Sequence, residues 1–201
     1  MRLSMIKTTF GPAGLLAALV AVGLSPGPVG AQMAPAMGAT PGVGDKARDF
    51  ALTSLEGKKV LLSGELAKGP VVLVVLRGWP GYQCPFCTRQ FGEYLTRADD
   101  VKAAGGRVVF VYPGPGEGLQ THAEAFTANK SMPADFTFLT DPEYTFTNAY
   151  GLRWDAPGET AYPSTFVLNK GGVVTFAATS RGHGDRVPAA DALKALVAAG
   201  R

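Results

Sequence analysis

The sequence predicts an α/β domain built around a mixed β-sheet, and three features carry that prediction. Residues 71–76 form a continuous apolar run, Val-Val-Leu-Val-Val-Leu, which is typical of a strand buried on both faces. A helical pattern follows, and residues 107–112 form a second apolar strand; a crossover of this length joins parallel strands with the usual right hand. Residues 164–168 and 173–178 flank the turn sequence Asn-Lys-Gly-Gly, which favours an antiparallel hairpin.

The other expected elements continue the alternation of strands and helices. Apolar residues recur at helical spacing from Cys87 to Ala98, and Gly105 and Gly106 end that helix. Because loops after two parallel strands open on the same edge of a sheet, the loops after residues 76 and 112 are expected to lie side by side. The remaining elements are strands at 50–52 and 60–62 around a turn at Glu56-Gly57, a strand at 136–140, and helices at 119–129, 143–150 and 190–199.

The composition is that of a folded domain. Of the 201 residues, 46% are hydrophobic and 17% are charged, which is too apolar and too weakly charged for a disordered chain. Two cysteines and two histidines are too few for a disulfide scaffold, a four-thiolate zinc site or multi-metal chemistry.

The first 31 residues have the pattern of a secretory signal peptide. Arg2 and Lys7 precede an apolar stretch at 11–24, and the small residues Val29 and Ala31 suit a signal peptidase. An apolar stretch of about 14 residues is shorter than the roughly 20 that a membrane-spanning helix needs. We therefore expect cleavage after Ala31 and a periplasmic or secreted mature protein.

The mature chain is expected to consist of a flexible linker at residues 32–44 and a single domain at residues 45–201. The linker is rich in Ala, Pro and Gly and carries no charge. Loss of Arg2 and Lys7 leaves 17 basic against 16 acidic residues, so no basic patch is expected for nucleic acid. No other apolar stretch is long enough to span a bilayer, so no membrane contact is expected after signal cleavage.

The two cysteines, Cys84 and Cys87, are the most informative residues. They lie between the buried strand at 71–76 and the first turn of a helix, where their sulfurs can approach and form a disulfide. Unpaired amide hydrogens and the positive end of the helix dipole favour a thiolate there. A structural disulfide is the alternative, but a bridge that closes only four residues contributes about 2 kcal/mol, so we predict a redox-active pair.

At this point the sequence resembles the thioredoxin-like superfamily, and within it the peroxiredoxin-like proteins of the alkyl hydroperoxide reductase and thiol-specific antioxidant group. The resemblance rests on Gly-Asp-Lys-Ala-Arg-Asp-Phe-Ala-Leu at 44–52, on the strand before the cysteines, and on Pro-Ser-Thr-Phe-Val-Leu-Asn-Lys-Gly-Gly at 163–172. It implies a thioredoxin-like fold with helices on both faces of a central mixed sheet. It also implies a thiol oxidoreductase without organic cofactor, which acts on a hydroperoxide or a disulfide and is reduced by an external thiol protein.

The resemblance supports two assignments of the nucleophile. In the peroxiredoxin pattern Pro-x-x-x-Thr/Ser-x-x-Cys, Pro80 and Cys87 fit the ends while Cys84 takes the hydroxyl position, so Cys87 attacks peroxide and Cys84 resolves. In the thioredoxin pattern Cys84 attacks and Cys87 resolves. Pro163 stands where peroxiredoxins carry an arginine and thioredoxins a cis-proline, whose neighbouring backbone pairs with an extended partner chain. We favour Cys84 as the nucleophile of disulfide exchange.

Several neighbours have both a functional and a structural interpretation. Arg77 and Arg89 bracket the cysteine loop and either stabilise a thiolate or face solvent. Trp79 and Tyr82 either shape a docking surface or pack against the core. The loop at 113–118 follows the adjacent parallel strand and is therefore expected beside the cysteines.

A non-enzymatic alternative is copper binding. Copper-delivery proteins of the same superfamily use two cysteines and a distant histidine, and Met33 and Met37 would add soft sulfur ligands. Those proteins, however, space their cysteines one residue further apart. His122 and His183 are candidates for proton transfer only if the fold brings one of them within reach of a sulfur.

Overall fold

The computed structural model describes residues 38–200, so the predicted signal peptide and the first part of the predicted linker lie outside the described residues. Within this part of the chain, no helix has the length and apolar character needed to cross a bilayer. The strands are β1 (Ala51–Ser54), β2 (Lys59–Leu61), β3 (Val71–Val75), β4 (Arg107–Gly114), β5 (Phe136–Pro142), β6 (Ser164–Leu168) and β7 (Val174–Thr179). The helices are α1 (Leu62–Leu66), α2 (Pro85–Leu95), α3 (Ala98–Ala103), α4 (Leu119–Thr127), α5 (Thr145–Ala149) and α6 (Ala189–Ala199).

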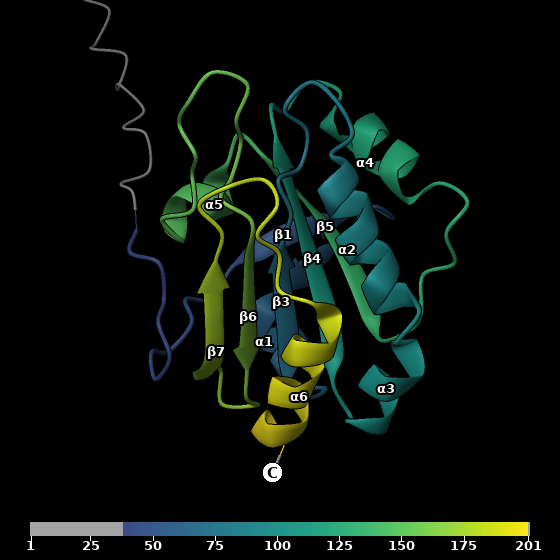
Figure 1. Cartoon of the computed structure of the whole chain (residues 1–201), viewed down its shortest axis with the longest axis vertical. Coiled ribbons are helices and arrows are strands. Elements are labelled where there is room, and N and C mark those ends of the chain that lie inside the picture. The colour runs from purple at the N-terminus through teal and green to yellow at the C-terminus, as the bar shows by residue number, and fades with distance from the viewer. Residues whose placement is uncertain (1–37, 201) are drawn as a thin grey trace, which may run out of the picture. The chain divides into compact units, whose positions relative to one another are not determined.

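The seven strands form one mixed sheet in the order β2-β1-β5-β4-β3-β6-β7 (Figure 1). β3, β4 and β5 are parallel neighbours at its centre, and both outer pairs, β1-β2 and β6-β7, are antiparallel hairpins. All five residues of β3 are fully buried, as the continuous apolar run predicts. The predicted α/β fold with a mixed central sheet is thus confirmed.

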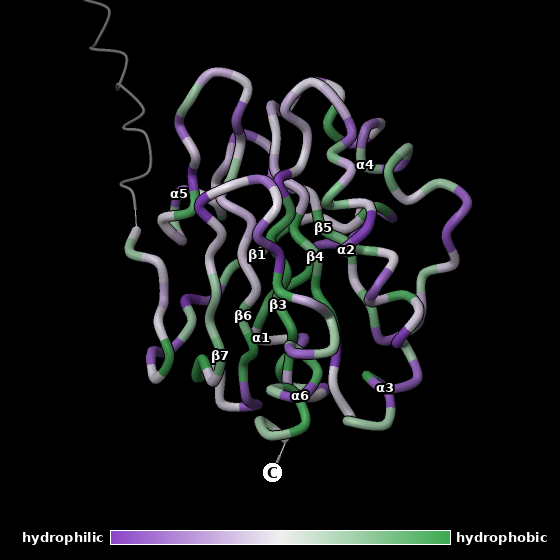
Figure 2. Tube along the Cα trace, viewed as in Figure 1, coloured by the Kyte–Doolittle hydropathy of each residue, from purple (hydrophilic) through white to green (hydrophobic). Residues whose placement is uncertain are grey.

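Helices cover both faces of the sheet, and a separate hydrophobic core lies under each group. On one face, α2, α3, α4 and α6 pack over a core that includes the strand residues Val72, Val74 and Phe110. On the other face, α1 and α5 pack over a core that includes Val75 and Val109, because successive side chains of a strand point to opposite faces. Figure 2 shows the apolar residues concentrated along β3 and β4, between the two helical layers.

Two local features differ from the sequence-based expectation. The helix expected to run from Cys87 to Ala98 is two helices, because Thr96 and Arg97 leave the helical path between α2 and α3. The hydroxyl of Thr96 donates to the Glu93 carbonyl at 2.9 Å, a side-chain bond that competes with continuation of the helix. α1 is a short helix that the sequence analysis did not predict.

Residues 38–44, which the sequence analysis placed in the flexible linker, are bound to the domain. The amide of Gly38 donates to the Asn148 carbonyl at 2.9 Å, and the amide of Gly44 donates to the Val174 carbonyl at 2.8 Å. The hydroxyl of Thr40 donates to the Gly151 carbonyl. The contacts of the domain therefore begin before Asp45, because small residues let this segment lie directly against its backbone.

The loops after β3 and β4 meet at one end of the sheet, as expected for parallel neighbours. The amide of Trp79 donates to the Pro113 carbonyl at 2.9 Å, which places the loop at 113–118 beside the loop that carries the cysteines. Gly78 has φ +73°, and a Cβ at this position would lie 1.8 Å from the Pro113 carbonyl oxygen. Only glycine fits this close approach.

We predict that Gly78→Ala destabilises the domain more than Gly81→Ala. Gly81 also has positive φ, at +106°, but a Cβ there meets nothing within 4 Å. Gly81→Ala is the control, and it measures only the cost of positive φ for a residue with a Cβ, about 1–2 kcal/mol of stability. Gly78→Ala has this cost and, in addition, the clash with Pro113. Denaturant unfolding of both variants measures the difference, and equal losses would show that the two loops do not need their close contact.

Candidate active site

The two cysteines occupy the start of α2. Cys84 is the N-cap residue, with extended backbone (φ −72°, ψ 116°), and Pro85 follows at the first helical position. Proline suits this position because its missing amide hydrogen would have no partner inside the helix. Cys87 lies in the first turn. Both thiols are unbridged and buried, with Cys84 2% and Cys87 0% exposed.

Two donors reach the sulfurs from outside the helix. The backbone amide of Arg77, just after β3, donates to the Cys87 sulfur at 3.3 Å. The Nη2 atom of Arg186 lies 3.8 Å from the Cys84 sulfur and 3.7 Å from the Cys87 sulfur. One guanidinium therefore contacts both members of the pair.

The electrostatic environment separates the two thiols. The pKa of Cys84 is lowered to about 5, above all because the Cys87 thiol donates a hydrogen bond to its sulfur. Burial alone would raise this pKa. Hydrogen bonds from the Cys87 and Phe86 amides and the charge of Arg186 lower it further. The pKa of Cys87 is raised well above its ordinary value, because it gives that hydrogen bond, is buried and faces the Cys84 charge. At neutral pH the pair therefore carries one negative charge, on Cys84.

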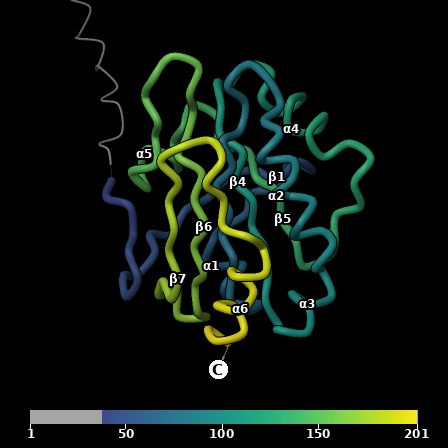
Figure 3. Tube along the Cα trace, in the orientation of Figure 1, coloured from purple at the N-terminus to yellow at the C-terminus, as the bar shows by residue number. Residues whose placement is uncertain are grey.

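Arg186 is the site residue that the sequence analysis missed. It lies in the loop between β7 and α6, about 100 positions from the cysteines in the sequence, and this loop runs from β7 across the end of β6 to α6 (Figure 3). The two arginines that were considered have other roles. Arg89 is exposed and lies over the Phe86 ring, 5.5 Å from its centroid. Arg77 contributes its backbone amide to Cys87, and its guanidinium points elsewhere.

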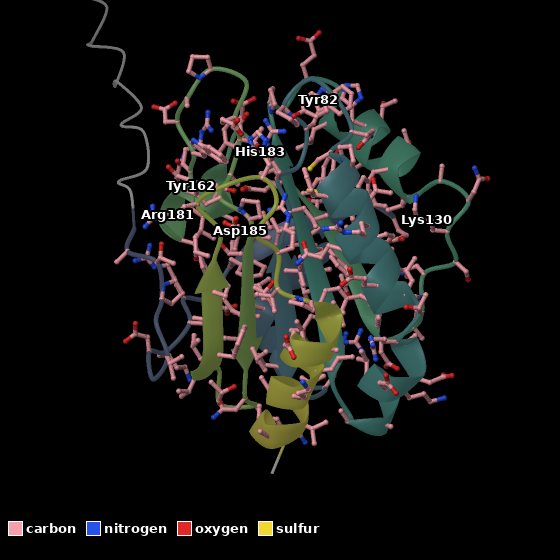
Figure 4. All side chains as sticks on the ribbon, viewed as in Figure 1. Tyr82, Lys130, Tyr162, Arg181, His183 and Asp185 are labelled. Atoms are coloured by element: carbon pink, nitrogen blue, oxygen red, sulfur yellow. The ribbon has the colours of Figure 1, made fainter. Side chains whose placement is uncertain are left out.

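The Arg77 guanidinium is buried in a polar network beside the cysteine loop. It donates to the Glu159 carboxylate at 2.7 Å, to the Gly158 carbonyl at 2.7 Å and to the Tyr82 hydroxyl. The Nε2 atom of His183 lies 2.9 Å from the second oxygen of Glu159. Figure 4 shows His183 on the loop that also carries Arg186, so Glu159 joins that loop to Arg77.

Neither histidine hydrogen-bonds to a sulfur. His183 bonds to Glu159, and His122 contacts aromatic and amide groups. Its ring stacks on Trp79 with centroids 3.6 Å apart. Its carbonyl accepts a hydrogen bond from Gln83 at 2.8 Å, and Gln83 in turn accepts one from the buried Tyr112 hydroxyl. These contacts hold the cysteine loop against α4, so Trp79 has a packing role. Tyr82, in contrast, is not part of the core, because its side chain is 47% exposed.

Pro163 lies just before β6, at the end of the sheet where the cysteine loop leaves β3. Val75 pairs with Ser164, so continuation of the antiparallel register sets Pro163 opposite Leu76, next to Arg77. Its carbonyl accepts a hydrogen bond from the Ser180 amide. The neighbouring backbone is not open to a partner strand, because the Tyr162 amide donates to the Leu152 carbonyl at 2.8 Å. The strand pairing that the thioredoxin pattern implies is therefore blocked at this amide.

The structure gives no support to the copper alternative. Within residues 38–200, no group of three or more His, Cys, Asp or Glu side chains is arranged to hold a metal ion. Met33 and Met37 lie outside the described residues.

We predict that Arg186→Met raises the pKa of Cys84 above about 5, because an opposite charge beside the thiolate is lost. A pH titration of thiolate ultraviolet absorbance measures the change. Arg89→Met is the matched control, since Arg89 does not contact a sulfur. An unchanged Cys84 titration in Arg186→Met would remove the guanidinium from the site chemistry.

We also predict that Glu159 makes stability depend on acidic pH. Burial raises the pKa of Glu159, but hydrogen bonds from Arg77 and His183 outweigh burial, so its pKa is lowered overall. Its stabilisation is present above the unfolded glutamate pKa and is lost as pH falls through the folded value. Glu159→Gln leaves Arg77 buried without its anion, at a cost of about 3–5 kcal/mol at neutral pH.

Denaturant unfolding at neutral and acidic pH measures this effect, and the stability difference between wild type and Glu159→Gln shrinks on acidification. Asp100→Asn, which breaks an exposed pair with Arg97, is the control and costs less than about 1 kcal/mol. Equal losses from the two variants would contradict the assignment.

Comparison with known proteins identifies the family to which the chain is similar. The AhpC/TSA family model matches residues 43–177. The chain is 32% identical over 125 residues to the chloroplastic peroxiredoxin Q of Sedum lineare, and the match covers 62% of each protein. The chloroplastic peroxiredoxin Q of Triticum aestivum is 31% identical over 128 residues, which are 64% of this chain and 54% of that protein. The chain thus spans less than two thirds of the length of these relatives.

Solved structures show the same fold. Peroxidoxin BcpB from Mycobacterium tuberculosis superposes with a TM-score of 0.63 at 24% identity, over 79% of this chain and 97% of that one. A Chlorobium tepidum protein that carries the name thiol:disulfide interchange protein DsbE superposes with a TM-score of 0.57 at 27% identity, over 78% and 99%. The thioredoxin-like fold is therefore confirmed. Because the family match covers about two thirds of the chain and includes the cysteine loop and strands β1 to β6, the chain belongs to the AhpC/TSA family of peroxiredoxin-like proteins.

Proposed function

We propose that this protein is a thiol peroxidase that reduces small hydroperoxides with Cys84 as the nucleophile and Cys87 as the resolving thiol. The observation that carries the proposal is the position of Cys84 at the N-cap of α2, with Arg186 3.8 Å from its sulfur. The hydrogen bond from Cys87 and the Arg186 charge lower the pKa of Cys84 to about 5. A thiol with this pKa is almost entirely thiolate at neutral pH, whereas a free cysteine is only a few per cent thiolate.

The proposed oxidation is a two-step reaction. The Cys84 thiolate attacks one peroxide oxygen, the O–O bond breaks, and the leaving oxygen takes a proton to become an alcohol or water. Cys84 is then a sulfenic acid. The Cys87 thiol attacks its sulfur, an S–S bond forms, the S–O bond breaks and water leaves. Cys87 is one helical turn away and already directed at Cys84, so the second step needs little movement.

A small oxidant suits this site better than a protein disulfide. The nucleophilic sulfur is only 2% exposed, and the Tyr162 amide that an extended polypeptide would use is bonded to Leu152. The positive charge of Arg186 beside both sulfurs suits a step in which a sulfur–oxygen bond forms and negative charge develops on the leaving oxygen.

Thiol–disulfide exchange is the second candidate. It is favoured by the placement of Cys84 at the N-cap with the more buried Cys87 behind it, the arrangement in which the outer sulfur attacks and the inner one resolves. The similarity to the Chlorobium tepidum protein named thiol:disulfide interchange protein DsbE supports the same interpretation.

The reducing partner and the compartment are parts of the proposal. An external thiol reductant, expected to be a protein, would return the Cys84–Cys87 disulfide to two thiols. The signal-like pattern of residues 1–31 supports export to the periplasm or beyond the cell, where a disulfide persists until it is reduced.

Stopped-flow oxidation of the reduced protein by hydrogen peroxide tests the proposal. Ionisation alone makes the wild type about 30-fold faster than a free cysteine at neutral pH. We expect Cys84→Ser to lose the fast reaction. Cys87→Ser should keep one rapid turnover and stop at a sulfenic acid, which a dimedone-type reagent traps.

The contrary outcomes identify the alternatives. Loss of the fast reaction in Cys87→Ser alone would make Cys87 the peroxide-attacking thiol, as in the peroxiredoxin pattern. Oxidation of the wild type no faster than a free thiol, together with rapid reduction of insulin disulfides, would establish disulfide exchange instead.

A further inference from the structure

A cavity of about 610 Å³ lies between the outer hairpin of the sheet and the loop before α6. Pro163, Phe176 and Val187 form much of its apolar wall, and Arg186, which contacts both sulfurs, lines it as well. Its volume is in the range of sites for organic ligands, and far larger than hydrogen peroxide requires. Nothing in the peroxide chemistry accounts for a cavity of this size.

Two residues that line the cavity carry three buried polar atoms with no hydrogen-bond partner among residues 38–200. They are the carbonyl oxygen of Gln90 and the Nε and Nη1 atoms of Arg186. Gln90 is only 3% exposed, and its amide nitrogen donates to the Val187 carbonyl at 3.5 Å, which leaves the oxygen as the end without a partner. Buried polar groups are normally paired, because each unpaired group costs about 1–3 kcal/mol.

These atoms specify the ligand that would satisfy them. The two Arg186 donors need a carboxylate or carbonyl oxygen, and the Gln90 oxygen needs an N–H group. Asp185 and Asp191 are exposed at the cavity rim, where a positively charged amine would be favourable. Figure 4 shows Asp185 on the loop that forms this rim. A ligand with carbonyl, amide and amino groups is a short peptide.

We propose that this cavity binds a small peptide thiol, which reduces the Cys84–Cys87 disulfide. The inference rests on the proposed function, since it requires that disulfide to form during turnover. Arg186 lines the cavity and also contacts both sulfurs, so a thiol bound beside its guanidinium would lie next to the bond that it must break. The protein reductant expected from the family resemblance is not needed for this route.

The reduction consumes two peptide thiols. The thiolate of the first attacks the Cys84 sulfur, the more exposed of the pair, and the Cys84–Cys87 bond breaks; Cys87 leaves and takes a proton. The thiolate of a second peptide attacks the peptide sulfur of this mixed disulfide, and Cys84 leaves as a thiolate. The low pKa of Cys84 favours this departure, since a thiol of lower pKa leaves faster. The products are a peptide disulfide and two protein thiols.

Binding is tested with S-methylglutathione, a tripeptide that cannot react, by calorimetry on the oxidised full-length chain. The disulfide is made with diamide and verified by mass, so a failure of the proposed peroxidase activity does not affect the result. We expect one site, at least tenfold weakened by Gln90→Leu. This variant should fold, because leucine removes a buried oxygen that has no partner and loses only the long hydrogen bond, 3.5 Å, to the Val187 carbonyl. Gln120→Leu is the matched control, because Gln120 is an exposed residue of α4, and this variant should bind the peptide like the wild type.

Kinetics give the second readout. Gln90→Leu should raise the KM for glutathione at least tenfold, and leave the rate of reduction by dithiothreitol unchanged, since that thiol has no amide or carboxylate. No binding by the wild type, or equal binding by wild type and Gln90→Leu, would overturn the proposal. A Gln90→Leu effect confined to the KM for an organic hydroperoxide would also overturn it, and would assign the cavity to the oxidant.

Discussion

The hydrogen bond from the Cys87 thiol to the Cys84 sulfur is the interaction on which the chemistry of this site depends. It places one proton between two sulfurs and leaves the negative charge on the sulfur at the N-cap. Cys87 is fully buried and its sulfur accepts the Arg77 amide, so the donor cannot turn away from its partner. The thiolate therefore depends on both the start of α2 and the end of β3, because neither segment alone holds both sulfurs in place.

Arg186 places a guanidinium at the sulfurs although the position just before β6 carries no arginine. Peroxiredoxins resembled by this chain carry an arginine just before the Ser/Thr-Phe strand, and Pro163 stands there. A guanidinium nevertheless reaches both sulfurs, from the loop between β7 and α6. Arg77 cannot fill the role although it is adjacent, because Glu159 and the Gly158 carbonyl hold its side chain in a separate network. The contact has thus moved to a different element of the same fold.

The sequence predicted the features that depend on local pattern. The apolar run of β3, the β6-β7 hairpin and the position of Cys84 and Cys87 at a strand-to-helix junction follow from hydrophobic periodicity and turn residues. Arg186 was missed because it reaches the cysteines only through the tertiary packing of β7 and α6, and no local pattern marks it. The occupied Tyr162 amide was missed for the same reason, since its partner Leu152 belongs to a segment without regular structure.

The reduced and oxidised forms of the Cys84–Cys87 pair differ in charge, and in the proposed cycle this difference would favour binding of a reductant to the oxidised form. In the reduced protein the Cys84 thiolate neutralises Arg186, whereas the disulfide carries no charge and leaves the guanidinium without its anion. A partly buried cation without an anion is unfavourable, so an anionic or carbonyl-bearing ligand would gain more at the oxidised site than at the reduced one. A reductant that uses Arg186 is therefore favoured when there is a disulfide to reduce, and the regenerated thiolate competes with it once the reaction is complete.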